Sequence, residues 1–246
     1  MTYCVGLKLN EGLVMLADTR TNAGVDNIST YRKLFTWEVP GERAIAMMSS
    51  GNLSITQGVM TRLNRSIQQA KADDSVETIL NADTMFRVAQ IVGDVMREVQ
   101  GRHSEALEQR GAAADATIMI GGQRKGGQHR LFLLYAAGNF IEATDDTGYF
   151  QIGDHKYGKP ILDRVLDKTT PIQEAVKAAL VSMDSTLRSN LSVGMPLDLA
   201  IIRTDTCEFS HQRRIEPDDQ AFSEMSEAWS HALRGAFQSL PGNFES

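Results

Sequence analysis

The chain has 246 residues, of which 42% are hydrophobic and 23% charged, and it carries a net charge of -6. This composition is that of a globular protein with a sizeable core, and the acidic balance argues against a nucleic-acid-binding surface. Two cysteines exclude a disulfide framework, and no run approaches the ~20 apolar residues that cross a bilayer. We therefore expect a cytoplasmic protein with neither nucleic-acid nor membrane partners.

Four strands are predicted before the first helix. Each is a short run of apolar or β-branched residues bounded by turn residues, and a polar loop over 19–31 separates the second from the third. The four predicted strands cover residues 2–9, 13–18, 33–39 and 44–48. The first two form a hairpin through the turn Asn10-Glu11-Gly12.

Helices follow, and the order of strands and then helices is repeated in the second half. Asn52 is a good N-cap for a helix running to about Ala72, and a second helix is capped near Asp83. Later strands are expected at 117–120, 129–136, 149–152 and 197–203, and later helices at 159–166 and 171–188. This order favours an α+β fold with antiparallel sheets over alternating βαβ units. Two stacked sheets with helix pairs outside would bury the apolar faces.

The composition changes after Arg203. Residues 204–214 are polar, residues 216–219 form an acidic helix start, and an apolar stripe at helical spacing follows. The stripe consists of Phe222, Met225, Trp229, Leu233 and Phe237. We divide the chain into a domain over 1–203 and an extension over 204–246 with an amphipathic helix. Its pattern favours docking on its own domain, and contact with another subunit is the alternative.

Thr2 is the residue on which the chemistry depends. A threonine freed from its initiator methionine has an α-amine with an ordinary pKa of ~7.7 to 8.0, which can accept the hydroxyl proton directly or through one water. Behind an uncleaved Met1 the same residue is an ordinary strand-starting threonine, because an amide nitrogen is not basic. We expect no propeptide, so that activation requires removal of Met1 alone.

Asp18 and Lys33 complete a candidate site. Asp18 ends one predicted strand and Lys33 begins the next, so antiparallel connectivity can bring both to Thr2. The Lys33 ammonium would lower the pKa of the Thr2 hydroxyl and favour a neutral α-amine, and Asp18 would keep Lys33 charged and oriented.

Other catalytic arrangements have less support. The five histidines lie in polar turns or in the tail, which argues against a Ser-His-Asp triad. No CxxC, HxH or HExxH spacing indicates zinc, and no Gly-rich loop joins a strand to a helix as phosphate binding requires. We expect no metal and no cofactor.

Several segments, in the same order along the chain, resemble the β-type subunits of proteasomes. They are Thr2 with Gly6, residues 12–20 (GLVMLADTR), residues 32–35 (RKLF), Ser50-Gly51, residues 118–122, and the stretch from Asp184 to Asp198. The resemblance covers residues 2 to about 203. Within that superfamily, Tyr3-Cys4, residues 156–160 (KYGKP) and the long tail look most like the Anbu group of bacterial proteasome-type peptidases.

The resemblance implies a four-layer αββα sandwich and an N-terminal nucleophile hydrolase. Thr2 attacks the peptide carbonyl, the Gly51 amide helps to hold the oxyanion, and Asp184 and Ser192 orient the amine. The implied catalytic residues are Thr2, Asp18, Lys33, Gly51, Asp184 and Ser192. The implied substrate-binding residues, which flank the cleft or shape the primary side-chain pocket, are Arg20, Asn22, Tyr31, Phe35, Ser49 and Leu53.

The sequence departs from the family pattern at several points. Asp154 stands where the family usually presents a serine, and a carboxylate near the nucleophile would raise the pKa of the amine. The interval from Asp18 to Lys33 is one residue shorter than in most β subunits, and the segment from Asp184 to Ser192 is longer than the family loop.

Three functions remain open from the sequence. The leading one is a threonine peptidase that assembles from copies of itself into a ring or an open helix and acts on peptides or unfolded proteins. An ATPase unfoldase would have to act in trans, since this chain contains no ATPase motif. The second is a structural subunit without activity, and the third is an amidase for small molecules.

Overall fold

The computed structural model describes residues 2–22, 28–109 and 115–242, which form an α+β fold with antiparallel sheets. The chain begins with the predicted hairpin, β1 (Tyr3–Leu9) and β2 (Gly12–Asp18). Its turn needs Gly12, whose φ of 141° is a region that other residues rarely adopt, and a Cβ there would lie 2.1 Å from the Ile202 carbonyl oxygen.

Two five-stranded sheets make up the body of the molecule. The first has the order β10-β1-β2-β11-β12, in which β10 is Tyr149–Gly153, β11 is Leu197–Arg203 and β12 is Phe209–Ile215. The second has the order β5-β6-β7-β8-β9, with bounds Leu34–Val39, Arg43–Gly51, Ala116–Arg124, Arg130–Leu134 and Phe140–Glu142. A short separate ladder pairs β3 (Arg20–Asn22) with β4 (Ile28–Thr30).

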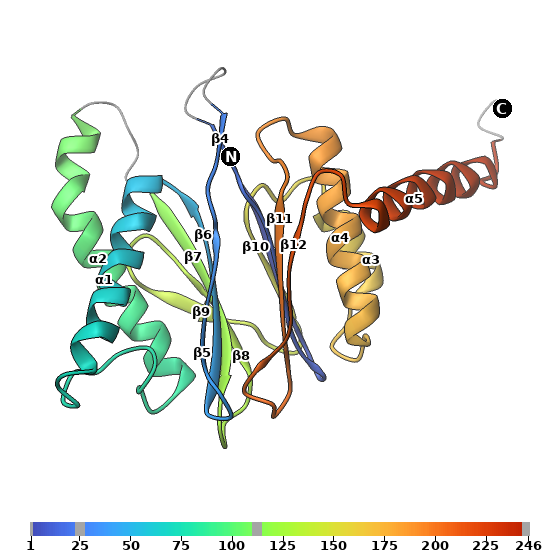
Figure 1. Cartoon of the computed structure of the whole chain (residues 1–246). Helices are drawn as coiled ribbons and strands as arrows, with labels where there is room; N and C mark the ends of the chain where they lie inside the picture. Colours follow the sequence, from blue (N-terminus) through green and yellow to red (C-terminus); the bar gives the residue numbers. More distant parts are fainter. Residues whose placement is uncertain (1, 23–27, 110–114, 243–246) are drawn as a thin grey trace.

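Helix pairs lie on the outer sides of the two sheets (Figure 1). On one side are α1 (Leu53–Ala70) and α2 (Met85–Glu108), and on the other α3 (Lys159–Val165) and α4 (Ile172–Ser189). Asn52 caps α1 as predicted, because its side chain accepts from the Ser54 amide. For α2 the capping contact is one residue later than predicted, since Thr84 Oγ1 accepts from the Arg87 amide at 3.0 Å.

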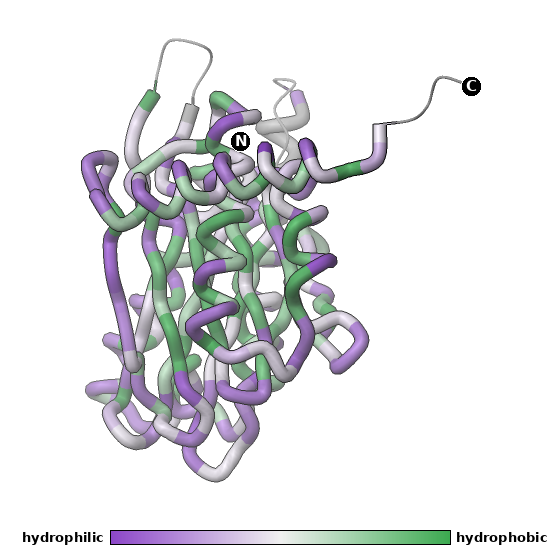
Figure 2. The backbone as a smooth tube through the Cα atoms, turned by 90° about the vertical axis from the view of Figure 1, so that its right-hand side faces the viewer, coloured by the Kyte–Doolittle hydropathy of each residue, from purple (hydrophilic) through white to green (hydrophobic). Residues whose placement is uncertain are grey.

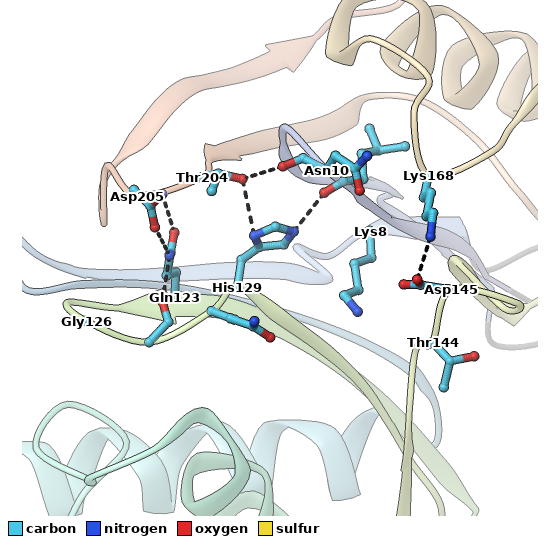
Figure 3. Close-up of a pocket in the computed structure, with 13 residues that line it drawn as sticks. Lys8, Asn10, Gln123, Gly126, His129, Thr144, Asp145, Lys168, Thr204 and Asp205 are labelled. Atoms are coloured by element: carbon cyan, nitrogen blue, oxygen red, sulfur yellow. Dashed lines mark hydrogen bonds and ion pairs between the residues drawn. The ribbon is translucent and has the colours of Figure 1, made fainter.

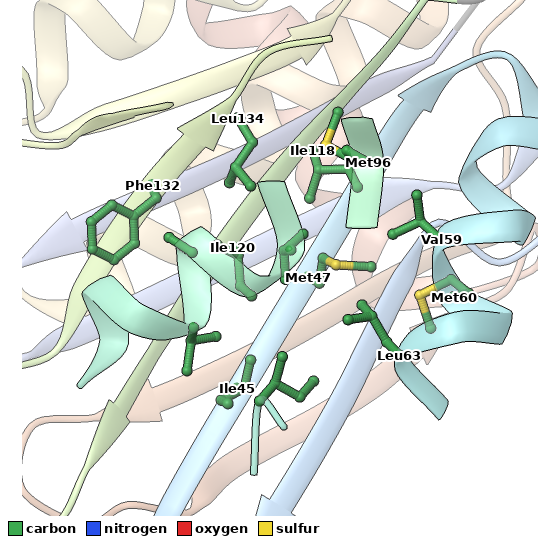
Figure 4. Packing of buried hydrophobic residues seen from close by; sticks show 14 of the residues in the cluster. Ile45, Met47, Val59, Met60, Leu63, Met96, Ile118, Ile120, Phe132 and Leu134 are labelled. Carbon is green, nitrogen blue, oxygen red and sulfur yellow. The ribbon is translucent and has the colours of Figure 1, made fainter. Parts of the chain in front are cut away.

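Three buried apolar clusters hold these elements together. One joins α1 and α2 to the second sheet through residues such as Ile45, Met47 and Val59 (Figure 4). Another joins α3 and α4 to the first sheet, and the third lies where the two sheets face each other. Strand β1 contributes Val5 to the helix side and Cys4 to the sheet side. A strand covered on both faces has no exposed side, which explains why β1 and β2 are nearly continuous apolar runs. Hydrophilic residues concentrate instead in the turns at the lower edge of Figure 2.

Several short strands were not predicted. The polar loop expected over 19–31 contains β3 and β4, and the polar stretch 204–214 contains most of β12. In β12 only Ile215 is buried among its described positions, because the strand lies at the edge of the sheet, and an exposed edge strand carries no apolar alternation. The domain boundary expected at residue 203 falls in the turn between β11 and β12, which pair with each other. The division itself stays a prediction.

The C-terminal helix α5 (Gln220–Gln238) begins at Asp219, whose side chain accepts from the Phe222 amide. Its first turns dock on the body: Phe222 packs against the cluster of the first sheet, and Ser226 is buried. Its far half extends away from the body (Figure 1), and its side chains Leu233 and Phe237 are 49% and 77% exposed. The first half therefore docks on its own chain as expected, and contact of the far half with another subunit stays a prediction. Within the described ranges, no helix is long and apolar enough to cross a membrane.

Candidate active site

Thr2 opens into a pocket of about 470 Å³ at the end of the first sheet where β1 begins. The pocket lies between the two sheets, because its walls come from the strand β6, the start of α1, the segment before β5, and the end of β10. Its described lining residues are Thr2, Thr21, Arg32, Lys33, Ser49, Ser50, Gly51, Leu53, Thr56, Thr117 and Gly153. Five sequence candidates, Thr2, Lys33, Gly51, Ser49 and Leu53, thus meet in one place.

The backbone of Thr2 is fixed by its neighbour β10. The Asp154 amide donates to the Thr2 carbonyl oxygen at 2.6 Å, next to the register pair of Tyr3 and Gly153. Gly153 has a φ of 83°, and a Cβ on it would lie 2.0 Å from the Thr2 carbonyl oxygen and 3.0 Å from the Thr2 Cβ. Glycine is therefore required at 153 for both conformation and space.

Asp18 and Lys33 form a buried ion pair beside Thr2. Lys33 Nζ lies 2.6 Å from Asp18 Oδ1 and also donates to the Arg20 carbonyl oxygen at 2.6 Å. Asp18 accepts from two backbone amides as well, Tyr3 at 3.0 Å and Gly194 at 3.2 Å. Burial raises the pKa of Asp18, and the Lys33 charge and these hydrogen bonds oppose the increase. The pair links the start of β1, the end of β2 and the start of β5.

Tyr3 and Cys4, which follow Thr2 in the chain, are both buried and have raised pKa values. Burial raises the pKa of Tyr3 to about 12, and its hydroxyl contacts Ser182 at 2.9 Å and Gln151 at 2.8 Å. Burial also raises the pKa of the Cys4 thiol, and Cys4 is completely buried. A thiol needs to ionise in order to react, so Cys4 does not compete with Thr2 as a nucleophile.

Gly51 ends β6 at the pocket with a φ of 99°. A Cβ there would lie 2.3 Å from the Asp115 carbonyl oxygen, so the close approach of β6 to β7 requires glycine. Ser49 and Ser50 precede it in the pocket wall. A strand end of this kind brings backbone amides to the surface of the pocket, where they can serve as donors to developing negative charge.

Asp154 is buried and belongs to a side-chain network. Its carboxylate accepts from Asn190 Nδ2 at 2.6 Å and from the Lys156 amide at 2.9 Å, and Asn190 Oδ1 accepts from the Ser192 amide at 3.0 Å. Sequence reasoning named Asp154 and Ser192 but missed Asn190, which joins them. Asn190 directly follows α4 and bonds there to Asp154, the residue after β10, a relation that no local sequence pattern records.

Asp184 has other partners. It accepts from Arg188 Nε at 3.1 Å and from Ser226 Oγ of α5 at 2.7 Å. Two residues earlier, Ser182 contacts Tyr3 at the base of β1. Two residues turn an α-helix through about 200°, so Asp184 faces α5 while Ser182 faces the sheet. The expectation that Asp184 lies beside the amine is not supported by these contacts.

The expected substrate residues divide into two groups. Ser49 and Leu53 line the pocket, whereas Tyr31 and Phe35 are not among its described lining residues. Phe35 packs in the cluster under α1 and α2, because it pairs with Met47 on that face of the sheet. Arg20 donates to the Leu191 carbonyl oxygen at 3.0 Å, and its guanidinium lies over Gly194. Asn22 is described through its backbone, which pairs with Ile28.

Larger pockets occur at the opposite end of the sheets. One of about 570 Å³ contains Lys8, Gln123 and His129 (Figure 3). His129 Nε2 lies 2.8 Å from the Leu9 carbonyl oxygen, so the ring links the β1–β2 turn to the second sheet. Burial lowers the pKa of His129. No group of three His, Cys, Asp or Glu residues that could hold a metal is found in the described ranges. The Thr2 pocket is smaller, but it alone among the described pockets is lined by Lys33 of the ion pair and by the strand-end glycines Gly51 and Gly153.

Solved structures match the chain over nearly its whole length. The Anbu Gly-1 mutant from Hyphomicrobium sp. strain MC1 is 50% identical with a TM-score of 0.90, and the match covers 98% of this chain and 99% of that one. Anbu from Yersinia bercovieri, described as an ancestral β-subunit, is 45% identical with a TM-score of 0.91 and 99% coverage of both chains. This chain belongs to the Anbu family.

A third match comes from an Anbu assembly. The helical assembly of the Anbu complex from Pseudomonas aeruginosa contains a chain that is 42% identical, with a TM-score of 0.92, and the match covers 99% of this chain and 98% of that one. No protein-family model and no curated protein matches the sequence. Membership of the Anbu family confirms the resemblance inferred from the segments around Thr2, Lys33 and the tail.

Proposed function

We propose that this Anbu chain is a threonine peptidase whose nucleophile is Thr2 after removal of Met1, a residue that lies outside the described part of the chain. The observation that carries the proposal is the pocket itself, which is lined by Thr2, Lys33 and the strand-end Gly51, with Lys33 held 2.6 Å from the buried Asp18 behind it. We further propose that the fold is the four-layer αββα sandwich of N-terminal nucleophile hydrolases, supported by the three buried clusters.

In the proposed reaction the Thr2 Oγ attacks the scissile carbonyl carbon and its proton passes to the α-amine. The oxyanion that forms is held by the Gly51 amide. The α-ammonium then gives the proton to the leaving nitrogen, the C–N bond breaks, and an ester to Thr2 remains. Water, activated by the same amine, hydrolyses that ester. The positive charge of Lys33 favours ionisation of the Thr2 hydroxyl throughout.

The outer residues of the site receive positioning roles. Asn190 and Asp154 hold the segment after α4 against the Thr2 backbone, and Ser192 is proposed to orient the amine from that segment. Asp184 is proposed to act indirectly, by tying α5 to the last turn of α4. The free, buried cysteines Cys4 and Cys207 support a reducing compartment such as the cytoplasm.

Replacing Thr2 by alanine should lower peptide hydrolysis by at least about 10³-fold, because the nucleophile is lost, whereas Thr2→Ser keeps a hydroxyl and should keep activity. Hydrolysis of fluorogenic peptides and covalent labelling by a peptide boronate would be measured on protein whose N-terminus is established by intact mass. Labelling that survives Thr2→Ala would overturn the mechanism. Hydrolysis of small amides but not of peptides would favour an amidase. Full retention of Met1 in native protein would favour a structural subunit.

We also propose that copies of the chain assemble through the far half of α5. This half exposes Leu233 and Phe237, four residues apart on one side of the helix, and Leu240 is exposed just beyond its end. A row of exposed apolar residues is typical of an interface. The helical assembly formed by the Anbu relative from Pseudomonas aeruginosa supports self-association. Such an assembly would exclude folded proteins from the Thr2 pocket and admit only unfolded substrates. An ATPase unfoldase acting in trans would supply these substrates.

The variant Leu233→Glu/Phe237→Glu should reduce the mass of the oligomer, because apolar side chains buried in the contact would be replaced by charged ones. Light scattering during size-exclusion chromatography would measure it. The matched control is His231→Glu/Gln238→Glu, which changes two exposed polar residues of the same helix. Equal masses for the wild-type chain and the first variant would show that assembly uses another surface.

A further inference from the structure

Polar side chains predominate among the residues that line the Thr2 pocket. Apart from Thr2 itself, hydroxyl side chains form much of it, and Leu53 is the one aliphatic side chain among its described lining residues. The hydroxyl residues are Thr21, Ser49, Ser50, Thr56 and Thr117. No Asp or Glu is found among the described lining residues. Thr56 Oγ1 already donates to the Leu53 carbonyl oxygen at 3.1 Å. An apolar substrate side chain would remove water from the other hydroxyl groups, which costs free energy.

Two cations reach this pocket, and their surroundings differ. Lys33 is buried and donates to Asp18 Oδ1 and to the Arg20 carbonyl oxygen, both at 2.6 Å. Its charge is thereby compensated inside the protein. The side chain of Arg32 is 62% exposed, so its guanidinium stands in solvent at the pocket and can turn toward a bound molecule.

The internal carboxylate nearest to Arg32 does not hold it. Arg32 Nε lies 3.9 Å from Asp198 Oδ2, which is longer than a hydrogen bond. Asp198 is bound instead by Arg214, whose Nε and Nη2 contact its two oxygens at 2.8 and 2.9 Å. The two-pronged bond to Arg214 compensates the charge of Asp198, so the exposed Arg32 side chain, which lines the pocket, can turn from Asp198 toward a bound molecule.

We infer that the site prefers peptides with an acidic side chain, glutamate or aspartate, at the residue bound in this pocket, and that Arg32 is the residue that recognises it. The inference rests on the proposed function. A planar guanidinium can donate two parallel hydrogen bonds to a carboxylate, and the hydroxyl groups of the wall can donate to its remaining lone pairs. The pocket of about 470 Å³ has room for a glutamate side chain with its flanking backbone.

The net charge of the whole chain opposes the binding of acidic peptides. A net charge of -6 disfavours the approach of an acidic peptide in general. A preference for glutamate would therefore have to come from local contacts at Arg32. It would also weaken as ionic strength rises, because the side chain of Arg32 is exposed to screening ions.

The test compares peptides that differ in one residue at the cleaved bond. Glutamate and glutamine have the same shape, so the ratio of their kcat/KM values isolates the charge, and leucine and lysine peptides complete the set. We expect glutamate to exceed glutamine by about tenfold, the effect of one charge-assisted hydrogen bond. Arg32→Gln should bring the ratio near one, and Arg32→Glu should make lysine the preferred residue. Arg97→Gln, which removes an arginine of similar exposure on α2, should leave the ratio unchanged.

Different failures have different meanings. Cleavage that depends on Thr2 but shows a glutamate-to-glutamine ratio near one, or a ratio that Arg32→Gln does not change, would overturn the inference and leave the peptidase intact. Cleavage of no peptide, or cleavage that persists in Thr2→Ala, would overturn the peptidase and the inference with it.

A further variant covers the case in which Arg32→Gln does not fold, which thermal unfolding would reveal. Arg32→Lys keeps the charge without the two-pronged geometry. A glutamate-to-glutamine ratio above one but below that of the wild-type chain supports the inference. A ratio near one in folded Arg32→Lys protein counts against a role for the charge at this position.

Discussion

Replacing Lys33 by methionine should lower the free energy of unfolding by about 3 to 5 kcal/mol and stop peptide hydrolysis. The change leaves Asp18, which is completely buried, without the ammonium 2.6 Å away. The amides of Tyr3 and Gly194 still donate to Asp18 but carry no net charge. Because one carboxylate contacts β1, the residue before β5 and the segment after α4, its loss of a partner disturbs several walls of the Thr2 site.

The stability of the Lys33→Met variant should depend on pH in a definite direction. Burial raises the pKa of Asp18 in the folded chain above its unfolded value. A raised carboxyl pKa means that the folded state binds the proton more tightly, so stability falls as pH rises through the window between the two values. Without Lys33 the folded pKa rises further and the window widens upward. Lys33→Met should therefore be most destabilised near neutral pH and recover as the pH is lowered.

Urea unfolding at several pH values would measure the effect of Lys33→Met. The matched control is Lys168→Met, because Lys168 Nζ also lies 2.6 Å from a carboxylate, Asp145, but the two side chains are 47% and 70% exposed. An exposed pair contributes at most about 1 kcal/mol. Asp18→Asn combined with Lys33→Met should regain part of the lost stability. Equal effects of the Lys33 and Lys168 variants would contradict the importance of burial at the site.

Gly153→Ala should lower activity by about 100-fold and also lower the free energy of unfolding. The added Cβ would lie 2.0 Å from the Thr2 carbonyl oxygen, a backbone atom, so one strand has to move. A shift of about 1 Å at a nucleophile costs about 100-fold in rate. Strain at a φ of 83° together with the overlap should lower the free energy of unfolding by about 2 to 5 kcal/mol.

A second glycine separates strain from contact. Gly41 also has a positive φ, 67°, but a Cβ there would meet nothing within 4 Å. Gly41→Ala should cost about 1 kcal/mol and leave activity intact. Boronate labelling of Thr2 and thermal unfolding would be measured for both variants. If Gly153→Ala labels as fast as the wild-type chain, the close packing of β10 on Thr2 is not needed for the chemistry.

The central part of the site could be predicted because it depends on strand ends. Thr2, Asp18 and Lys33 lie at the termini of long apolar strands, and hairpin connectivity brings such termini together whatever the surrounding loops do. The buried pair between Asp18 and Lys33 at 2.6 Å agrees with that prediction. Asn190 was missed because its role depends on where α4 ends relative to β10, a tertiary relation that no local pattern records.

Phe35 and Asp184 have contacts other than those expected, because side-chain direction depends on tertiary structure. Phe35 was expected in the pocket, but strand alternation turns it toward α1 and α2, while its neighbour Leu34 faces the first sheet. Asp184 was placed by its distance along a resembling segment, yet the turn of α4 directs it to Ser226. Edge strand β12 escaped prediction because its exposed side chains follow no apolar period.

The bond between α4 and α5 has a consequence for how such a chain can change during evolution. Ser226 and Arg188 together satisfy the buried Asp184, so substitutions in the first turns of α5 have to be matched by substitutions in α4. Beyond Ser230 the side chains of α5 are exposed, so substitutions there need no matching substitution in α4. If copies assemble through the outer half as proposed, mutations there can alter the geometry of assembly without disturbing the pocket around Thr2.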